Sequence, residues 1–353
     1  MAAKRSLPAS LLALLFVLVA ACSPTASTAP TATTAVVGTL APTLAPTTAP
    51  TTAPTSTPVP AFPVTITDDE GTAVTLKGEP LKIVSLTPAT TETLFAIGAG
   101  SRVVGKVQDV ANFPPEAASI PEVATFAGVD VEKIVALSPD LVVSGGAGLT
   151  QGDAVTKLRA AGIPVIVSYP TTVETAIDGI RLLGKATGLV DAATLLADAV
   201  QRKLGNLRNV AMQAGGKPRV FYEIDTTGGI FTPPVDSIYG ELFTMANAQQ
   251  IGGNASYQIS LEQLVAADPQ VILLGDAAYG ATADAVKKRE GWGGMTAVKT
   301  GAILPIDDIV VTRPGPRIID GLAALIRAIH PELTTLVCPA LELPCPTPVP
   351  AAS

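Results

Sequence analysis

The chain has 353 residues, and its net charge of -7, from 23 lysines and arginines against 30 aspartates and glutamates, argues against a nucleic-acid binder, which needs clustered positive charge. The length suits roughly two domains, and with 48% hydrophobic residues the chain cannot be disordered throughout. Although the mean hydropathy is +0.43, no stretch beyond the N-terminal leader approaches the roughly 18 apolar residues of a membrane-spanning helix.

The chain begins with a segment typical of a secretory signal. A short basic stretch precedes an apolar run from Leu11 to Val19, and small residues follow it. Because this run is too short to span a bilayer, residues 1–21 are predicted to be a signal peptide that directs export. The string VAAC, which ends at Cys22, resembles a bacterial lipobox; the alternative is a cysteine late in a plain signal peptide. The resemblance implies cleavage before Cys22, lipidation of its thiol and anchoring on the outer face of the cytoplasmic membrane.

Proline-rich segments are predicted at both ends of the folded region. Residues 22–61 are almost entirely Thr, Ala, Pro and Ser, so they predict an extended tether that spans on the order of 100 Å at full stretch. Residues 337–353 are predicted to be a Pro-rich tail, and they contain Cys338 and Cys345. Outside the cytoplasm these two thiols either pair in a disulfide or remain reduced.

The region between the tails alternates strand-like runs with helix-like runs. The strand-like runs are short, rich in β-branched residues and bounded by Gly or Pro: 82–86, 140–144, 163–168, 219–224 and 271–275. This alternation predicts an α/β fold with buried parallel strands.

One part of the chain aligns on another without gaps. The segment VEKIVALSPDLVVSGGAG, which begins at Val131, matches LEQLVAADPQVILLGDAA, which begins at Leu261, at an offset of 130 residues. Each copy reads as a helix, a Pro-marked turn and a strand. Such a match also arises by chance in α/β proteins, but as a repeat it predicts two similar lobes, residues 62–190 and 217–336.

A long helix is predicted between the two copies, within residues 191–216. Asp191 is a suitable N-cap, apolar residues recur at helical spacing, and Gly215 and Gly216 end the pattern near Gln213. At 1.5 Å per residue the helix is about 35 Å long. This length suits a strut that joins two lobes, the alternative being an ordinary surface helix within one lobe.

These segments resemble a family, the substrate-binding proteins of ABC importers for vitamin B12, ferric siderophores and haem. The resemblance covers nearly the whole folded region and rests on motifs in the expected order: KIVSLTPATTETLFAIGAGSRVVGK, PEVATFAGVDVEKIVALSPDLVVS, GGNASYQISLEQLVAADPQVILL, GWGGMTAVKTGAILPID and RPGPRIIDGL. It implies two Rossmann-like α/β lobes joined by a single long helix. It also implies a monomer without enzymatic activity or resident cofactor, which delivers a metal-chelate ligand to a permease and its ATPase.

The ligand is expected in a cleft between the lobes, where loops leave the carboxyl ends of the strands. A large, flat ligand needs aromatic faces together with polar groups at the rim. The candidate ligand-binding residues are Thr87, Thr90, Asp109, Phe126, Ser144, Gly145, Tyr169, Phe231, Tyr257 and Arg313. The alternatives are that an aromatic residue fills the core and that Arg313 pairs with a carboxylate.

The same resemblance favours a corrinoid ligand. The vitamin B12-binding members carry Trp at the places of Phe126 and Tyr257, so the aromatic type is kept there. Those members have bulky aromatics where this chain has 144–148, Val310 and Val311. A ferric siderophore or haem therefore remains the alternative ligand.

Glu132 and Glu262 occupy the same position in the two copies of the repeat. In the family that the chain resembles, one glutamate on each lobe docks on arginines of the permease, and the resemblance implies this role for Glu132 and Glu262. Two carboxylates matched to two cationic pockets orient a protein and speed its encounter with a partner. The alternative is a pair of solvated helix residues.

Other classes of function fit less well. An enzyme of the Ser-His-Asp type would depend on His330, the single histidine, and no G-x-S-x-G motif is present. One histidine is also too few for the His-rich site of a zinc or manganese importer. A surface sensor lipoprotein without a transport role remains open from the sequence.

Overall fold

The computed structural model describes residues 62–125, 127–149 and 151–343, all of which belong to one structural unit. The expected signal peptide and tether lie outside these residues, as do Cys22, Phe126 and Cys345. The lipidation of Cys22 and the pairing of Cys338 with Cys345 therefore stay predictions.

The N-terminal lobe is built on a six-stranded sheet in the order β6-β5-β4-β3-β7-β8. Its strands are parallel except for the β5–β6 pair. They are β3 (Ile83–Ser85), β4 (Val103–Val107), β5 (Glu122–Thr125), β6 (Gly128–Val129), β7 (Leu141–Ser144) and β8 (Val165–Val167). The helices are α1 (Pro88–Ala96), α2 (Val131–Leu137), α3 (Gly152–Ala160) and α4 (Val173–Thr187), and a hairpin of β1 (Val64–Thr67) and β2 (Ala73–Leu76) precedes them.

The C-terminal lobe is built on a four-stranded parallel sheet in the order β11-β9-β13-β14. Its strands are β9 (Arg219–Glu223), β11 (Gln249–Ile251), β13 (Val271–Leu274) and β14 (Ile303–Pro305), with a separate hairpin of β10 (Ile230–Phe231) and β12 (Gln258–Ile259). The helices are α6 (Ile238–Met245), α7 (Leu261–Ala267), α8 (Ala283–Lys287), α9 (Thr296–Thr300), α10 (Asp308–Thr312), α11 (Ile318–Ile329) and α12 (Thr334–Ala340).

The expected α/β architecture is confirmed. Each of the strand-like runs in the sequence contains one of the parallel strands β3, β7, β8, β9 and β13. Every residue of β3, β7 and β8 is buried, which explains their continuous apolar sequences, because helices cover both faces of a parallel sheet.

The repeat found in the sequence is also a repeat of structure. Shifting α2 and β7 by 130 residues gives the bounds of α7 and β13, and the same shift carries β6 onto β12. Both helices end at a residue in the left-handed region, Ser138 with φ 49° and Asp268 with φ 45°. The match is therefore a repeated unit of hairpin strand, helix, turn and strand.

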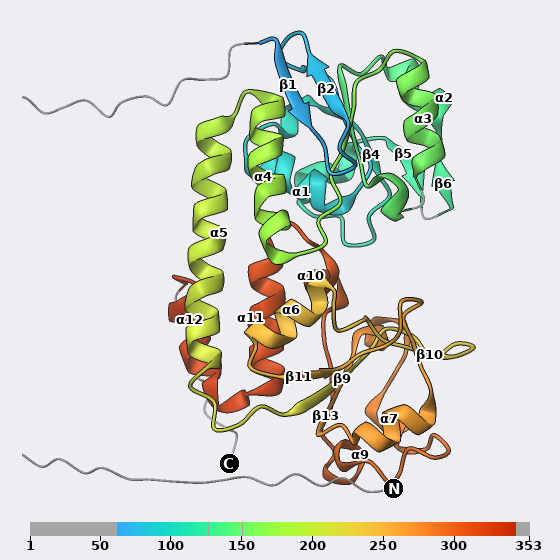
Figure 1. Cartoon of the computed structure of the whole chain (residues 1–353), viewed down its shortest axis with the longest axis vertical. Coiled ribbons are helices and arrows are strands. Elements are labelled where there is room, and N and C mark those ends of the chain that lie inside the picture. The colour runs from blue at the N-terminus through green and yellow to red at the C-terminus, as the bar shows by residue number, and fades with distance from the viewer. Residues whose placement is uncertain (1–61, 126, 150, 344–353) are drawn as a thin grey trace, which may run out of the picture. The chain divides into compact units, whose positions relative to one another are not determined.

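Helix α5 (Val190–Ala211) connects the lobes, as the sequence predicts (Figure 1). It contacts α4 of the N-terminal lobe and α6, α11 and α12 of the C-terminal lobe. Asp191 is not its N-cap: the cap is Leu189, without a side-chain hydrogen bond, and Asp191 lies inside the first turn. The buried stripe of α5 belongs to one hydrophobic cluster that reaches from β3 and α1 to β13 and α11.

The C-terminal boundary differs from the expected one. Residues 337–340 continue helix α12, where Val337 is fully buried, and Leu341 is buried after them. The prolines predict a tail, but Val337 and Leu341, four residues apart, form an apolar face, and α12 packs on α5.

Within the described part of the chain, we find no single helix that combines the length and apolar character needed to cross a bilayer. Helix α11 meets that test only together with Pro331–Ala340, and this pair is bent by 119°.

Candidate functional site

A cleft of about 540 Å³ lies between the two lobes. On the N-terminal side its wall consists of the start of α1, residues 168–171 after β8, and α4. On the C-terminal side residues 236–239, 308–309 and 312–314 line it, together with Tyr257 and Tyr279. Most of these segments follow strands, so the cleft lies where loops leave the sheets, as expected for an α/β protein.

Two threonines shape the start of α1 at the cleft. The Thr87 side chain caps the helix and accepts a hydrogen bond from the Thr90 backbone N–H at 3.1 Å. The Thr90 hydroxyl lies 2.6 Å from the Ser85 hydroxyl and donates to the Thr87 carbonyl at 3.0 Å. Both threonines are buried but line the cleft, so they position the helix N-terminus at its wall.

Of the other residues that the sequence singles out, Tyr169, Tyr257 and Arg313 line the cleft. Asp109 does not line it but binds Arg313. Phe126 lies outside the described residues.

Ser144, Gly145 and Phe231 are not among the residues that line the cleft. The Ser144 hydroxyl donates to Gln151 Oε1 at 2.8 Å, and the Gly145 N–H donates to the same oxygen at 3.0 Å, so both residues are held on Gln151. Gly145 instead lines a separate hollow of about 340 Å³ with Asp69. Phe231 is half-buried in the β10–β12 hairpin.

Tyrosines dominate the aromatic lining of the cleft. The chain has five, and Tyr169, Tyr239, Tyr257 and Tyr279 line it. Tyr279 is 79% exposed. Burial raises the pKa of Tyr239, and burial together with Tyr169 raises the pKa of Tyr257, so both phenols remain uncharged at neutral pH. The site thus offers aromatic faces with neutral hydroxyls.

Sequence reasoning missed Tyr239 and Tyr279. The position of Tyr279 in the sequence could have indicated its role. Tyr279 is the last residue of the short 3₁₀ helix that follows β13, and Tyr169 lies in a similar place after β8. In a chain with so few aromatic residues, a tyrosine just after a buried strand indicates a cleft position.

Arg313 pairs with carboxylates of the opposite lobe. Its Nη1 lies 2.7 Å from Glu92 Oε1 and 3.1 Å from Asp109 Oδ2, and its Nη2 donates to Asp109 Oδ1. Burial opposes ionisation of Asp109, but the hydrogen bond and charge of Arg313, together with the backbone N–H groups of Ala111 and Phe113, outweigh it and hold the pKa of Asp109 below its usual value. Burial raises the pKa of Glu92, against the effect of Arg313. The interpretation of Arg313 as the partner of a carboxylate is thus confirmed.

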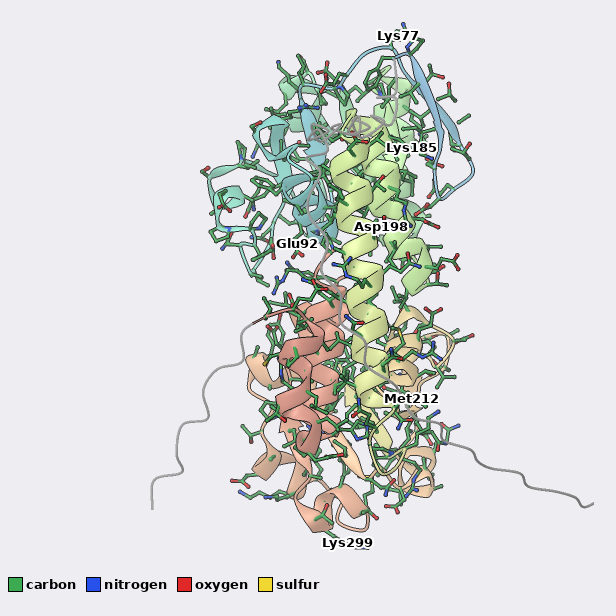
Figure 2. The ribbon with its side chains drawn as sticks, turned by 90° about the vertical axis from the view of Figure 1, so that its left-hand side faces the viewer. Lys77, Glu92, Lys185, Asp198, Met212 and Lys299 are labelled. Carbon is green, nitrogen blue, oxygen red and sulfur yellow. The ribbon has the colours of Figure 1, made fainter. Side chains whose placement is uncertain are left out.

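The segment RPGPR, residues 313–317, is a second connection between the lobes. The Arg317 guanidinium lies 4.1 Å from the centroid of the Phe113 ring, and its Nη1 is 3.5 Å from Glu92 Oε1. Gly315 approaches α1 so closely that an added Cβ would lie 3.2 Å from the Ala89 carbonyl oxygen. Glu92 itself lies at the end of the N-terminal lobe nearest α11 (Figure 2).

Among the described residues that line the cleft, the charged ones are Asp236, Asp308 and Arg313. Asp236 is exposed, whereas Asp308 accepts a hydrogen bond from the Tyr222 hydroxyl, and burial raises its pKa. Because Arg313 already has two carboxylate partners, the cleft has no excess of positive charge.

Glu132 and Glu262 lie outside the cleft. Each is exposed and occupies the first turn of its helix, α2 or α7, directly after the capped N-terminus. Hydrogen bonds at this N-terminus lower the pKa of Glu262. The repeat therefore displays one exposed carboxylate on each lobe.

Residues 83–310 match the model of a family described as periplasmic binding protein. The chain is 33% identical over 277 residues to the ABC transporter substrate-binding lipoprotein YvrC of Bacillus subtilis, which covers 77% of this chain and 87% of that protein. It is 30% identical over 285 residues to the cobalamin-binding protein of Halobacterium salinarum, covering 76% of this chain and 75% of that one.

The fold is similar to that of the periplasmic heme-binding protein RhuT from Roseiflexus sp. RS-1, solved in its apo form. The TM-score is 0.64 at 25% sequence identity, and the alignment covers 74% of this chain and all of that one. The names of these similar proteins thus include both a cobalamin binder and a haem binder.

Proposed function

We propose that this chain, which belongs to the periplasmic binding protein family and is the substrate-binding protein of an ABC transporter, captures a corrinoid in the cleft between its lobes. It would hand this ligand to the permease for import driven by the ATPase. The observation that carries the choice of ligand is the lining of the cleft, four tyrosines around a site without excess positive charge.

Each property of the lining matches a property of the ligand. A corrinoid is a large, flat ring system whose rim carries uncharged carboxamides, so it needs aromatic faces and neutral polar groups. The tyrosine rings supply faces, and the hydroxyls and Asp236 supply hydrogen-bond partners for amides. Haem, by contrast, carries two propionates that need cations, and Arg313 is already paired with Glu92 and Asp109.

A calorimetric titration of the full chain in non-ionic detergent tests the proposal. We expect saturable binding of cyanocobalamin or cobinamide and none of haem or of anionic ferric siderophores. Replacing Tyr279→Ala should weaken corrinoid binding by about tenfold, because a buried aromatic contact is worth on the order of 1.4 kcal/mol or more. Its exposure in the free protein means that the fold should not suffer.

The matched control is Phe231→Ala, which removes an aromatic ring outside the lining of the cleft and should leave the affinity unchanged. Saturable binding of haem or a ferric siderophore, without binding of any corrinoid, would contradict the proposed ligand. The transport role would be unaffected by that result.

We propose further that Glu132 and Glu262 dock the loaded protein on the permease. They repeat at an offset of 130 residues, they are exposed, and each lies on a different lobe. Two separated carboxylates fit two cationic pockets on one partner and fix its orientation.

The double variant Glu132→Gln/Glu262→Gln should therefore lower uptake of the ligand by tenfold or more in cells, with no change in its affinity for the purified protein. Uptake of radiolabelled ligand and calorimetry measure the two quantities. Glu174→Gln is the control, because Glu174 is an exposed glutamate in the first turn of α4, outside the repeat. Normal uptake by the double variant would favour a docking surface elsewhere.

Anchoring through Cys22 completes the proposal. YvrC is a lipoprotein by name, and the VAAC string stands at the expected place for lipid attachment in this chain. The receptor would then remain at the outer face of the cytoplasmic membrane, close to its permease.

A further inference from the structure

We infer that Glu92 and Asp109 are specificity-determining residues, which neutralise Arg313 and thereby make the cleft reject ligands that carry carboxylates at their rim. The inference rests on the proposed function and deepens it, since it names the rim chemistry that the cleft accepts. Neither residue needs to touch the ligand, because both act through Arg313.

The ion pairs leave Arg313 little attraction for a further anion. One guanidinium faces two carboxylates, with Nη1 at 2.7 Å from Glu92 Oε1 and at 3.1 Å from Asp109 Oδ2. Its Nη2 also donates to Asp109 Oδ1, so the pair with Asp109 is bidentate. The three side chains together carry a net negative charge.

Burial makes these pairs costly to exchange. The side chains of Arg313, Glu92 and Asp109 are 10%, 1% and 5% exposed. A ligand carboxylate that approached Arg313 would displace a buried carboxylate rather than water, and the displaced group would lose its partner in a poorly solvated place. One oxygen, Glu92 Oε2, is already buried without a hydrogen-bond partner, so the cluster has acceptors in excess.

The surroundings reinforce this selection. The other charged residues among the described lining are acidic, Asp236 and Asp308. Arg317 contributes a second cation at 3.5 Å from Glu92, but it also stacks on Phe113 and lies 3.6 Å from Asp320. With Arg313 neutralised, these acidic groups repel a ligand that carries the same sign of charge.

The test compares two ligands that share a corrin ring and differ in rim charge. Cobinamide carries amides at its rim, and cobyrinic acid carries carboxylates on the same corrin ring. Calorimetry of the full chain in detergent should show cobinamide binding at least a hundredfold more tightly. Asp109→Asn and Glu92→Gln should each reduce this ratio by tenfold or more, with the cobinamide affinity changed by less than threefold.

The control is Glu174→Gln, which makes the same change of charge at an exposed site outside the cleft and should leave the ratio unchanged. If either carboxylate variant fails to fold, the salt dependence of ligand binding by the wild-type protein still tests the inference. Added salt screens charge, so it should tighten cobyrinic acid binding several-fold and leave cobinamide binding unchanged.

The outcomes separate the two proposals. If the wild type binds cobinamide but the ratio is the same in both variants, the role of Glu92 and Asp109 is overturned and the corrinoid proposal stands. If no corrinoid binds, the proposal of a corrinoid ligand is wrong. The affinities of haem and its dimethyl ester are then compared, since these two ligands also differ in rim carboxylates. Tighter binding of haem than of the ester by the wild type would overturn the inference on rim charge.

Discussion

Replacing Arg313→Ala should lower the free energy of unfolding of the protein by about 3–5 kcal/mol, because removing one partner of a buried ion pair leaves the other charge uncompensated. Here two carboxylates, Glu92 and Asp109, lose their principal cation at once. Urea denaturation followed by circular dichroism measures the change. Arg313→Lys should fall between the wild type and the alanine variant, because a lysine cannot form the bidentate pair with Asp109.

Arg202→Ala is the control for this experiment. Arg202 forms a bidentate pair with Glu342, but both side chains are exposed, so its loss should leave the denaturation midpoint within error. A loss below 1 kcal/mol in Arg313→Ala would contradict the assignment of a stabilising connection to this cluster.

Ending the chain after Leu336 should destabilise the protein by about 5 kcal/mol, since it removes Val337 and Leu341 from the core at roughly 1.5–3 kcal/mol each, together with the smaller Cys338. Their removal also exposes the face of α5 on which α12 packs. Denaturation of the otherwise complete chain measures this effect.

A chain that ends after Leu343 provides the comparison. It keeps α12 and also lacks Cys345, so the difference between the two shortened chains isolates the packing of residues 337–343. Equal stability of the two chains would mean that the end of α12 contributes nothing to the core.

The sequence was a good guide wherever the structure depends on local patterns. The strand at 140–144 and its counterpart at 271–275 are continuous apolar runs, and the structure places β7 and β13 in them. The helix that joins the lobes was found from its apolar spacing, although its cap was not, because Asp191 is an acceptable residue in a first helical turn as well as at an N-cap.

Features that depend on distant contacts could not be predicted. Arg313 binds Glu92 and Asp109, which lie 221 and 204 residues earlier in the chain, and no local pattern indicates such a partner. Ser144 is the last residue of β7, where a cleft residue would lie, but its hydroxyl donates to Gln151. Pro339 suggested an irregular tail, yet it lies within α12, where tertiary packing outweighs its low helix propensity.

The hydrophobic cluster that passes through α5 makes the two lobes one cooperative unit. Side chains as far apart in the sequence as Ile83, Val200 and Leu322 belong to it, and a lobe produced alone would expose its share of this surface to water. The repeated units are thus no longer independent modules: they cannot be separated or exchanged with a related protein one at a time. A substitution in this cluster must therefore preserve the packing of both lobes against α5.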